Sequence, residues 1–110
     1  QLAELTKYAD WIVDAFLGTG ARGAPRTPLD AVIQQLNACD GRKLALDLPS
    51  GLDCDTGEIA SPTFQADHTC TFVAAKPGLV LRSSAPYVGQ VHVIDIGAPK
   101  KLLNTFVIAT

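Results

Sequence analysis

The chain has 110 residues, 47% of them hydrophobic and 18% charged, which predicts one compact domain with its own core. The formal charge is −2, the pI is about 5.5, and lysines and arginines are scattered, which argues against a nucleic-acid partner. No stretch approaches the ~18–20 apolar residues of a membrane helix, and the N-terminus is too polar for a signal peptide. We therefore expect a cytoplasmic protein that does not bind membranes.

The three cysteines are Cys39, Cys54 and Cys70. Their odd number, wide spacing and lack of a C-x-x-C pair argue against a disulfide framework and against structural zinc. We expect reduced thiols. A catalytic cysteine is the alternative, although no histidine accompanies any of the three in a recognisable motif.

The first half of the chain predicts a helix, a strand and a second helix. Leu2 to Tyr8 has helical spacing, and the apolar run Trp11 to Leu17 (WIVDAFL) predicts a strand buried on both faces. From Pro28 the apolar residues recur with a helical period, and Thr27 can cap this helix. We expect the helix to end by Gly41.

Three further apolar runs predict strands, namely 43–48, 69–74 and 90–96. A strand, a helix and a strand joined by short loops indicate a parallel crossover, so the predicted class is α/β with a mostly parallel sheet. Residues 50–67 contain too many Gly, Pro and Asp residues for a helix, so we expect either a long loop or a missing helix there.

A glycine-rich segment follows the first strand and satisfies the pattern G-x-G-x-x-G from Gly18 to Gly23. Pro25 and Pro28 delay the helix that a dinucleotide site would place within this pattern. The loop, with Arg22 and Arg26, can still cradle phosphate through its N–H groups. A connection without a ligand is the alternative.

Two carboxylates and a serine are the main candidates for chemistry. Asp14 lies inside an apolar strand and needs a partner, which is either a site ligand or the N–H groups of a neighbouring loop. Asp47 ends the second strand, where open α/β sheets bind ligands. Ser50 lacks the first glycine of a nucleophile elbow, and its hydroxyl suits an oxygen ligand better.

Three further residues have weaker indications. His68 and His92 have no metal-ligand spacing between them, so we expect structural roles. Lys76 follows the third strand, where it either approaches the ligand edge or stays solvated.

Taken in series, several motifs resemble one family. They are DWIVDAFLGTG (10–20), ALDLPSGLD (45–53), TG (56–57), ADHTCTF (66–72), KPGL (76–79) and GQVHVIDIG (89–97). Their order and spacing resemble the N-terminal domain of YjeF-type proteins, the NAD(P)H-hydrate epimerases, over nearly the whole chain.

The resemblance implies a Rossmann-like three-layer α/β/α domain, often a homodimer, that interconverts the R and S forms of hydrated NADH or NADPH and binds potassium. It implies that Asp14 and Ser50 are potassium ligands, in keeping with the preference of hard cations for oxygen. It also implies that Asp47 contacts the hydrated nucleotide, and we expect Asp47 to be the catalytic proton carrier. The remaining implied substrate contacts are Gly18, Thr19, Gly20, Ala21, Arg22, Gly23 and Ala24.

The family's upstream loop, G-x-G-N-N-G-G-D-G, is absent from these residues. We therefore expect residues 1–110 to be a partial domain, lacking its N-terminal part, of a longer epimerase that works with a fused or separate dehydratase. A non-catalytic nucleotide-binding or scaffold module of the same fold is the alternative. A dehydrogenase is disfavoured because the prolines delay the helix that should accompany the glycine motif, and because no hydride-transfer acid is visible.

Overall fold

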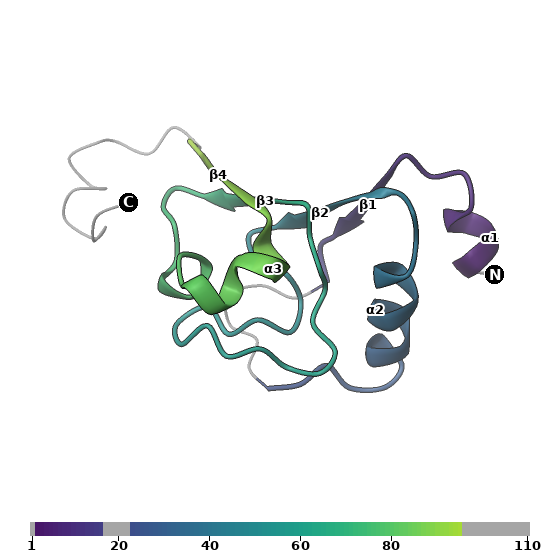
Figure 1. Cartoon of the computed structure of the whole chain (residues 1–110), viewed down its shortest axis with the longest axis horizontal. Coiled ribbons are helices and arrows are strands. Elements are labelled where there is room, and N and C mark those ends of the chain that lie inside the picture. Colours follow the sequence, from purple (N-terminus) through teal and green to yellow (C-terminus); the bar gives the residue numbers. More distant parts are fainter. Residues whose placement is uncertain (1, 17–22, 96–110) are drawn as a thin grey trace.

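The computed structural model describes residues 2–16 and 23–95, which form a parallel sheet with short helices (Figure 1). The strands are β1 (Trp11–Asp14), β2 (Arg42–Leu46), β3 (His68–Phe72) and β4 (Gln90–Ile94), paired in the order β1-β2-β3-β4. The helices are α1 (Leu2–Thr6), α2 (Leu29–Asn37) and α3 (Ala85–Val88), with 3-10 turns at Pro77–Leu79 and Arg82–Ser84. All three neighbouring pairs of strands are parallel, so their carboxyl ends meet at one edge of the sheet.

Helix α2 connects β1 to β2, as the sequence predicts, and begins one residue later than expected. Pro28 is the residue that precedes its first turn, and no side chain caps it. Thr27 donates instead to Asp30 at 3.3 Å. Ile33 and Leu36, three residues apart, are the buried side chains of α2, so its apolar stripe faces the sheet.

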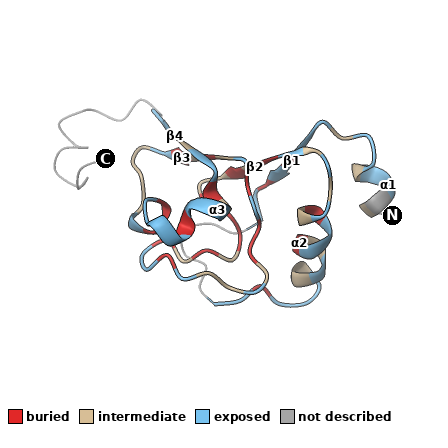
Figure 2. Cartoon of the chain, viewed as in Figure 1, coloured by how far each residue is buried: buried red, intermediate tan, exposed pale blue. Residues whose placement is uncertain are grey.

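The core lies on one face of the sheet, where Figure 2 shows the buried residues facing the helices. One cluster joins α2 to Ile12 of β1 and Ala45 of β2, and the other surrounds Leu48 and Val88. Ile12 and Ala45 of the first cluster point to the same side of the sheet, because Ile12 pairs with Lys43 and Ala45 lies two residues further along β2.

The opposite face of the sheet is open in the described residues. Trp11 is 46% exposed and Val13 48%, while Ile12 and Asp14 between them are buried. The expectation that the first strand is buried on both faces is therefore wrong for Trp11–Asp14. The α/β class and the parallel sheet are confirmed, with the helices of the described residues on one side of it.

The connection from β2 to β3 is the long loop that its composition predicts, with only an isolated bridge between Leu52 and Ile59. The side chain of Asn37 holds it against α2 by donating to the carbonyl of Thr63 at 3.0 Å and accepting from the N–H of Gln65 at 2.8 Å. The three cysteines, all within the described residues, form no disulfide. In the part of the chain that the structure describes, no helix is both long and apolar enough to cross a membrane.

Candidate active site at the carboxyl ends of the strands

Asp14 and Ser50 meet at the carboxyl edge of the sheet. Asp14 is 1% exposed, and its Oδ2 accepts from the Ser50 N–H at 2.7 Å while its Oδ1 accepts from the Ser50 hydroxyl at 2.7 Å. The N–H of Phe16 adds a third donor to Oδ1 at 3.2 Å. The carboxylate therefore bonds the N–H of a neighbouring loop, as one of the two alternatives predicts, and the role of Asp14 as a site ligand stays a prediction.

The turn after β2 holds Ser50 in place. Gly51 has a φ of +103°, a backbone conformation that side chains rarely adopt. A Cβ added there would also lie 2.6 Å from the Thr63 hydroxyl and 2.7 Å from the Pro62 carbonyl oxygen. The glycine thus lets the turn pack directly against the long loop, and this contact fixes the serine beside β1.

The chemistry of this pair suits a hard cation in part. Among residues 2–16 and 23–95, no cationic side chain forms an ion pair with Asp14. A buried carboxylate without a cation is costly, and oxygen donors are what potassium and similar ions prefer. Two side-chain oxygens form only part of a coordination shell, so an ion here would need ligands in addition to Asp14 and Ser50.

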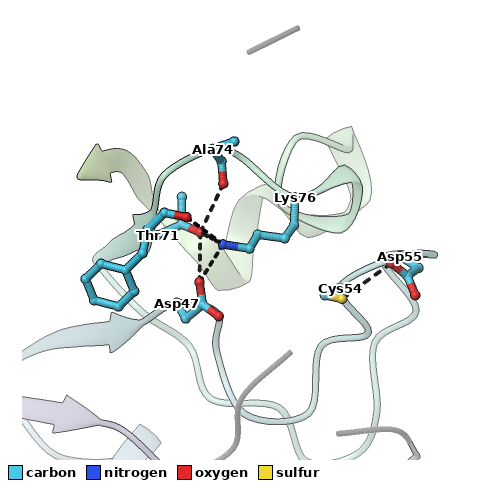
Figure 3. Close-up of polar contacts among 7 residues, drawn as sticks. Asp47, Cys54, Asp55, Thr71, Ala74 and Lys76 are labelled. Atoms are coloured by element: carbon cyan, nitrogen blue, oxygen red, sulfur yellow. Dashed lines mark hydrogen bonds and ion pairs between the residues drawn. The ribbon is translucent and has the colours of Figure 1, made fainter. Parts of the chain in front are cut away.

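Asp47, directly after β2, forms an ion pair with Lys76, which follows β3 (Figure 3). The ammonium lies 2.7 Å from Asp47 Oδ1, and each side chain is 21% exposed. Thr71 of β3 also donates to Oδ1 at 3.0 Å. Three segments of the chain therefore converge on one carboxylate oxygen.

The backbone at this edge is unusual. Asp47 has a φ of 72° and Val73 a φ of 75°, and they are the two residues other than glycine with positive φ in the described ranges. Each directly follows the last residue of a strand, β2 and β3 respectively. Such conformations cost about 1–3 kcal/mol each and concentrate at functional sites, so they mark this edge independently of the side chains.

A hollow of about 170 Å³ lies against the loop that begins after β2, lined by Gly23, Ala24, Gly51 and Asp53, among others, while the neighbouring Ser50 is itself buried. Two of the predicted substrate contacts, Gly23 and Ala24, thus face the turn that carries Ser50. The other five, Gly18 to Arg22, lie outside the described residues. Ligand pockets typically measure ~300–1,000 Å³, so this hollow accommodates only part of a dinucleotide.

The sequence did not single out Thr71, and it left Lys76 undecided. The signal in the sequence that points to Thr71 is the alternation in β3, where Thr69 and Thr71 are buried polar residues on the core side.

His68 and His92 lie in contact, with Nδ1 and Nε2 3.1 Å apart, because their strands are neighbours. No group of three or more His, Cys, Asp or Glu residues in the described ranges has the geometry to hold a metal ion.

A parallel sheet with its polar groups gathered beyond the strand ends defines an α/β protein of Rossmann-like architecture. The family model described as "YjeF-related protein N-terminus" matches residues 1–78. The chain belongs to this family.

Two curated relatives carry the name NAD(P)H-hydrate epimerase. The protein from Pirellula staleyi is 50% identical over 96 residues, which cover 87% of this chain and 42% of the relative. The protein from Rhodopirellula baltica is 45% identical, with 88% of this chain and 40% of the relative covered. The chain thus spans about two fifths of their length.

A longer relative from Hyperthermus butylicus is named a bifunctional NAD(P)H-hydrate repair enzyme, and it is 50% identical over 83% of this chain and 17% of its own length. Among solved structures, that of yeast ynu0 matches with a TM-score of 0.75 and 24% identity, covering 97% of this chain and 44% of the yeast chain. This structural likeness supports the fold alone.

Proposed function

We propose that this chain forms the carboxyl-terminal part of an NAD(P)H-hydrate epimerase domain, which interconverts the R and S forms of hydrated NADH or NADPH. The observation that carries the proposal is the placement of Asp14, Ser50 and Asp47 at one sheet edge, where the turn after β2 lines a hollow together with Gly23 and Ala24. The names of the relatives from Pirellula staleyi and Rhodopirellula baltica support the substrate class.

In this proposal, Asp47 carries the proton. The substrate bears a hydroxyl on the carbon next to the ring nitrogen, and protonation by the Asp47 carboxyl lets the C–O bond break. The nitrogen lone pair forms the C=N bond of a planar iminium, and water departs. Water then adds to the other face and returns its proton to Asp47, so the cycle consumes no net proton.

Asp14 and Ser50 would supply some of the ligands of a potassium ion, and the ion would offset phosphate charge near the glycine loop. The distance of 2.7 Å between Asp14 Oδ1 and the Ser50 hydroxyl oxygen supports a shared ion. We further propose that the complete protein is a cytoplasmic homodimer and works with a fused or separate dehydratase.

The role of Asp47 is tested by D47N in the full-length protein that contains this chain. Asparagine tolerates positive φ, so the backbone should keep its conformation while the proton carrier is lost. We expect kcat for epimerisation to fall by about 10²–10⁴-fold. D40N, at an exposed aspartate near the start of β2, is the matched control and should behave as wild type. An undiminished rate in D47N would remove Asp47 from this role.

The ion site is tested by thermal unfolding of the full-length protein in potassium and in caesium at equal ionic strength. An ion that binds only the folded state raises Tm with its concentration. We expect potassium to raise the Tm of the wild type and to have no selective effect on D14A. Epimerisation in the same two salts then tests substrate and ion together. A wild-type protein that binds hydrated NADH without epimerising it would favour the non-catalytic module instead.

A further inference from the structure

We propose that Lys76 is a positioning residue for Asp47, and that it makes one carboxylate oxygen structural and leaves the other for the substrate. The proposal rests on the proposed epimerase function. It starts from the contacts of the Lys76 ammonium, which lies among three acceptors at the end of β3 (Figure 3).

All three N–H donors of the ammonium have partners within the protein. They are Asp47 Oδ1 at 2.7 Å, Thr71 Oγ1 at 2.8 Å and the Phe72 carbonyl at 3.0 Å. An ammonium has three donors and no acceptor, so this set uses its full capacity. Lys76 in this arrangement therefore acts on a substrate through Asp47 and not by direct contact.

The two oxygens of Asp47 differ in their surroundings. Oδ1 accepts from both Lys76 and Thr71, whereas Oδ2 receives no hydrogen bond from any residue in the described ranges. The side chain remains 21% exposed, so a ligand can reach it. The geometry thus assigns the proton-carrying role to Oδ2 and the anchoring role to Oδ1.

The backbone around Lys76 is itself held firmly. Gly78, two residues on, donates its N–H to the Cys54 carbonyl at 2.7 Å, and a Cβ at Gly78 would collide with the Asp53 carbonyl. Leu79 is 2% exposed within the second core cluster. The turn that carries Lys76 is therefore packed against the long loop, and it delivers the ammonium to a fixed place.

This arrangement predicts an effect on kcat more than on KM. Asp47 is a carboxylate when the substrate ring is an iminium, and that is the state in which its bond to an ammonium is charge-assisted. An interaction that strengthens on the way to the transition state acts on kcat, whereas uniform binding acts on KM.

The experiment uses K76M in the full-length protein, with steady-state epimerisation and thermal unfolding both measured. Loss of a charged hydrogen bond should lower kcat by about 10- to 100-fold, with KM changed less than about threefold. K76R restores the charge and should recover part of the lost kcat, although its planar fork cannot reproduce all three bonds.

K43M is the matched control. Lys43 is buried, and its ammonium bonds two backbone carbonyls, those of Cys39 at 2.5 Å and Gly41 at 3.2 Å, at the opposite end of the strands. Its replacement should lower Tm and leave the kcat of the folded protein unchanged. If K76M and K43M share one phenotype, a lower Tm at unchanged kcat, Lys76 is merely structural and the proposal is overturned.

T71V is the second variant, should K76M fail to fold. It removes the other donor to Oδ1 and one of the three acceptors of the Lys76 ammonium, while the bond from Lys76 to Asp47 remains, so kcat should again fall at nearly constant KM, by a smaller factor than in K76M. Unchanged kcat in T71V would overturn the anchoring of Oδ1. If the wild type epimerises and these variants keep the wild-type kcat, the proposal fails while the proposed function stands. If the wild type itself does not epimerise, both fail.

Discussion

A carboxylate that is 1% exposed is one of the costliest groups a protein can bury, and Asp14 shows how the cost is met. Its oxygens accept from two N–H groups and one hydroxyl, all supplied by Phe16 and Ser50. Each of these bonds is charge-assisted and thus stronger than a neutral one. The carboxylate therefore ties the end of β1 to the turn after β2, and the local stability depends on it.

Replacing Asp14 with alanine should lower the free energy of unfolding by about 3 kcal/mol, because the buried N–H and hydroxyl of Ser50 lose their acceptor. S50A should cost only about 1 kcal/mol, since the backbone N–H bond to Asp14 remains. Urea denaturation of both variants measures the difference. Equal losses would mean that the bond between the Ser50 hydroxyl and the carboxylate accounts for the whole effect and that the N–H bond adds nothing.

The need of Asp14 for a partner could be predicted from the sequence, because an acid in an apolar strand is unfavourable unless it is bonded. That Ser50 is this partner followed only from the family resemblance, and the structure supplies the contact. The Asp47–Lys76 pair could not be predicted, since 28 residues separate the two along the chain (48–75) and only the parallel alignment of β2 and β3 brings them together.

At the level of elements, the two glycines that border the hollow have different reasons for being glycine. Both have positive φ, +79° at Gly23 and +103° at Gly51, but a Cβ at Gly23 meets nothing within 4 Å. At Gly51 it would meet Thr63 and Pro62 at less than 3 Å. Glycine is therefore needed at Gly23 only for the backbone conformation, whereas at Gly51 it is needed for close packing as well.

We therefore expect G51A to lower the free energy of unfolding by about 3 kcal/mol or more, since the long loop must shift to make room. G23A should cost about 1 kcal/mol, the strain of the left-handed backbone alone. Thermal unfolding of the two variants side by side checks the ranking. A larger loss of stability in G23A than in G51A would contradict the close packing of the Gly51 turn against the long loop.

The elements themselves were largely predictable. The four predicted strands and the predicted helix after Pro28 all begin within two residues of the predicted position. Their starts were predictable because apolar runs and helical periodicity are local signals. Burial on both faces was not predictable for β1: a continuous apolar run such as WIV indicates apolar neighbours on both sides, but in the described residues only one side has them.

For the molecule as a whole, the exposed sheet face offers a direct test. Trp11 is the single tryptophan, is 46% exposed and lies near the Arg42 guanidinium, 5.6 Å from its ring centre. In the 110-residue chain at low concentration, we expect its fluorescence to be quenched efficiently by iodide.

Raising the protein concentration is the control, since apolar faces promote association. Protection of Trp11 from iodide that grows with protein concentration would indicate self-association at this face. Protection that is complete and independent of concentration would contradict an open face in the isolated chain.

The left-handed backbone at Asp47 affects how this position should be probed. Alanine is poorly suited to a φ of 72°, so an alanine scan would mix a conformational penalty with the chemical one. The D47G substitution would relieve the strain of the main chain and remove the carboxyl group. We expect D47G to be more stable than the wild type and to have a lower kcat, as is typical of strained catalytic positions. Asparagine alone separates the two contributions.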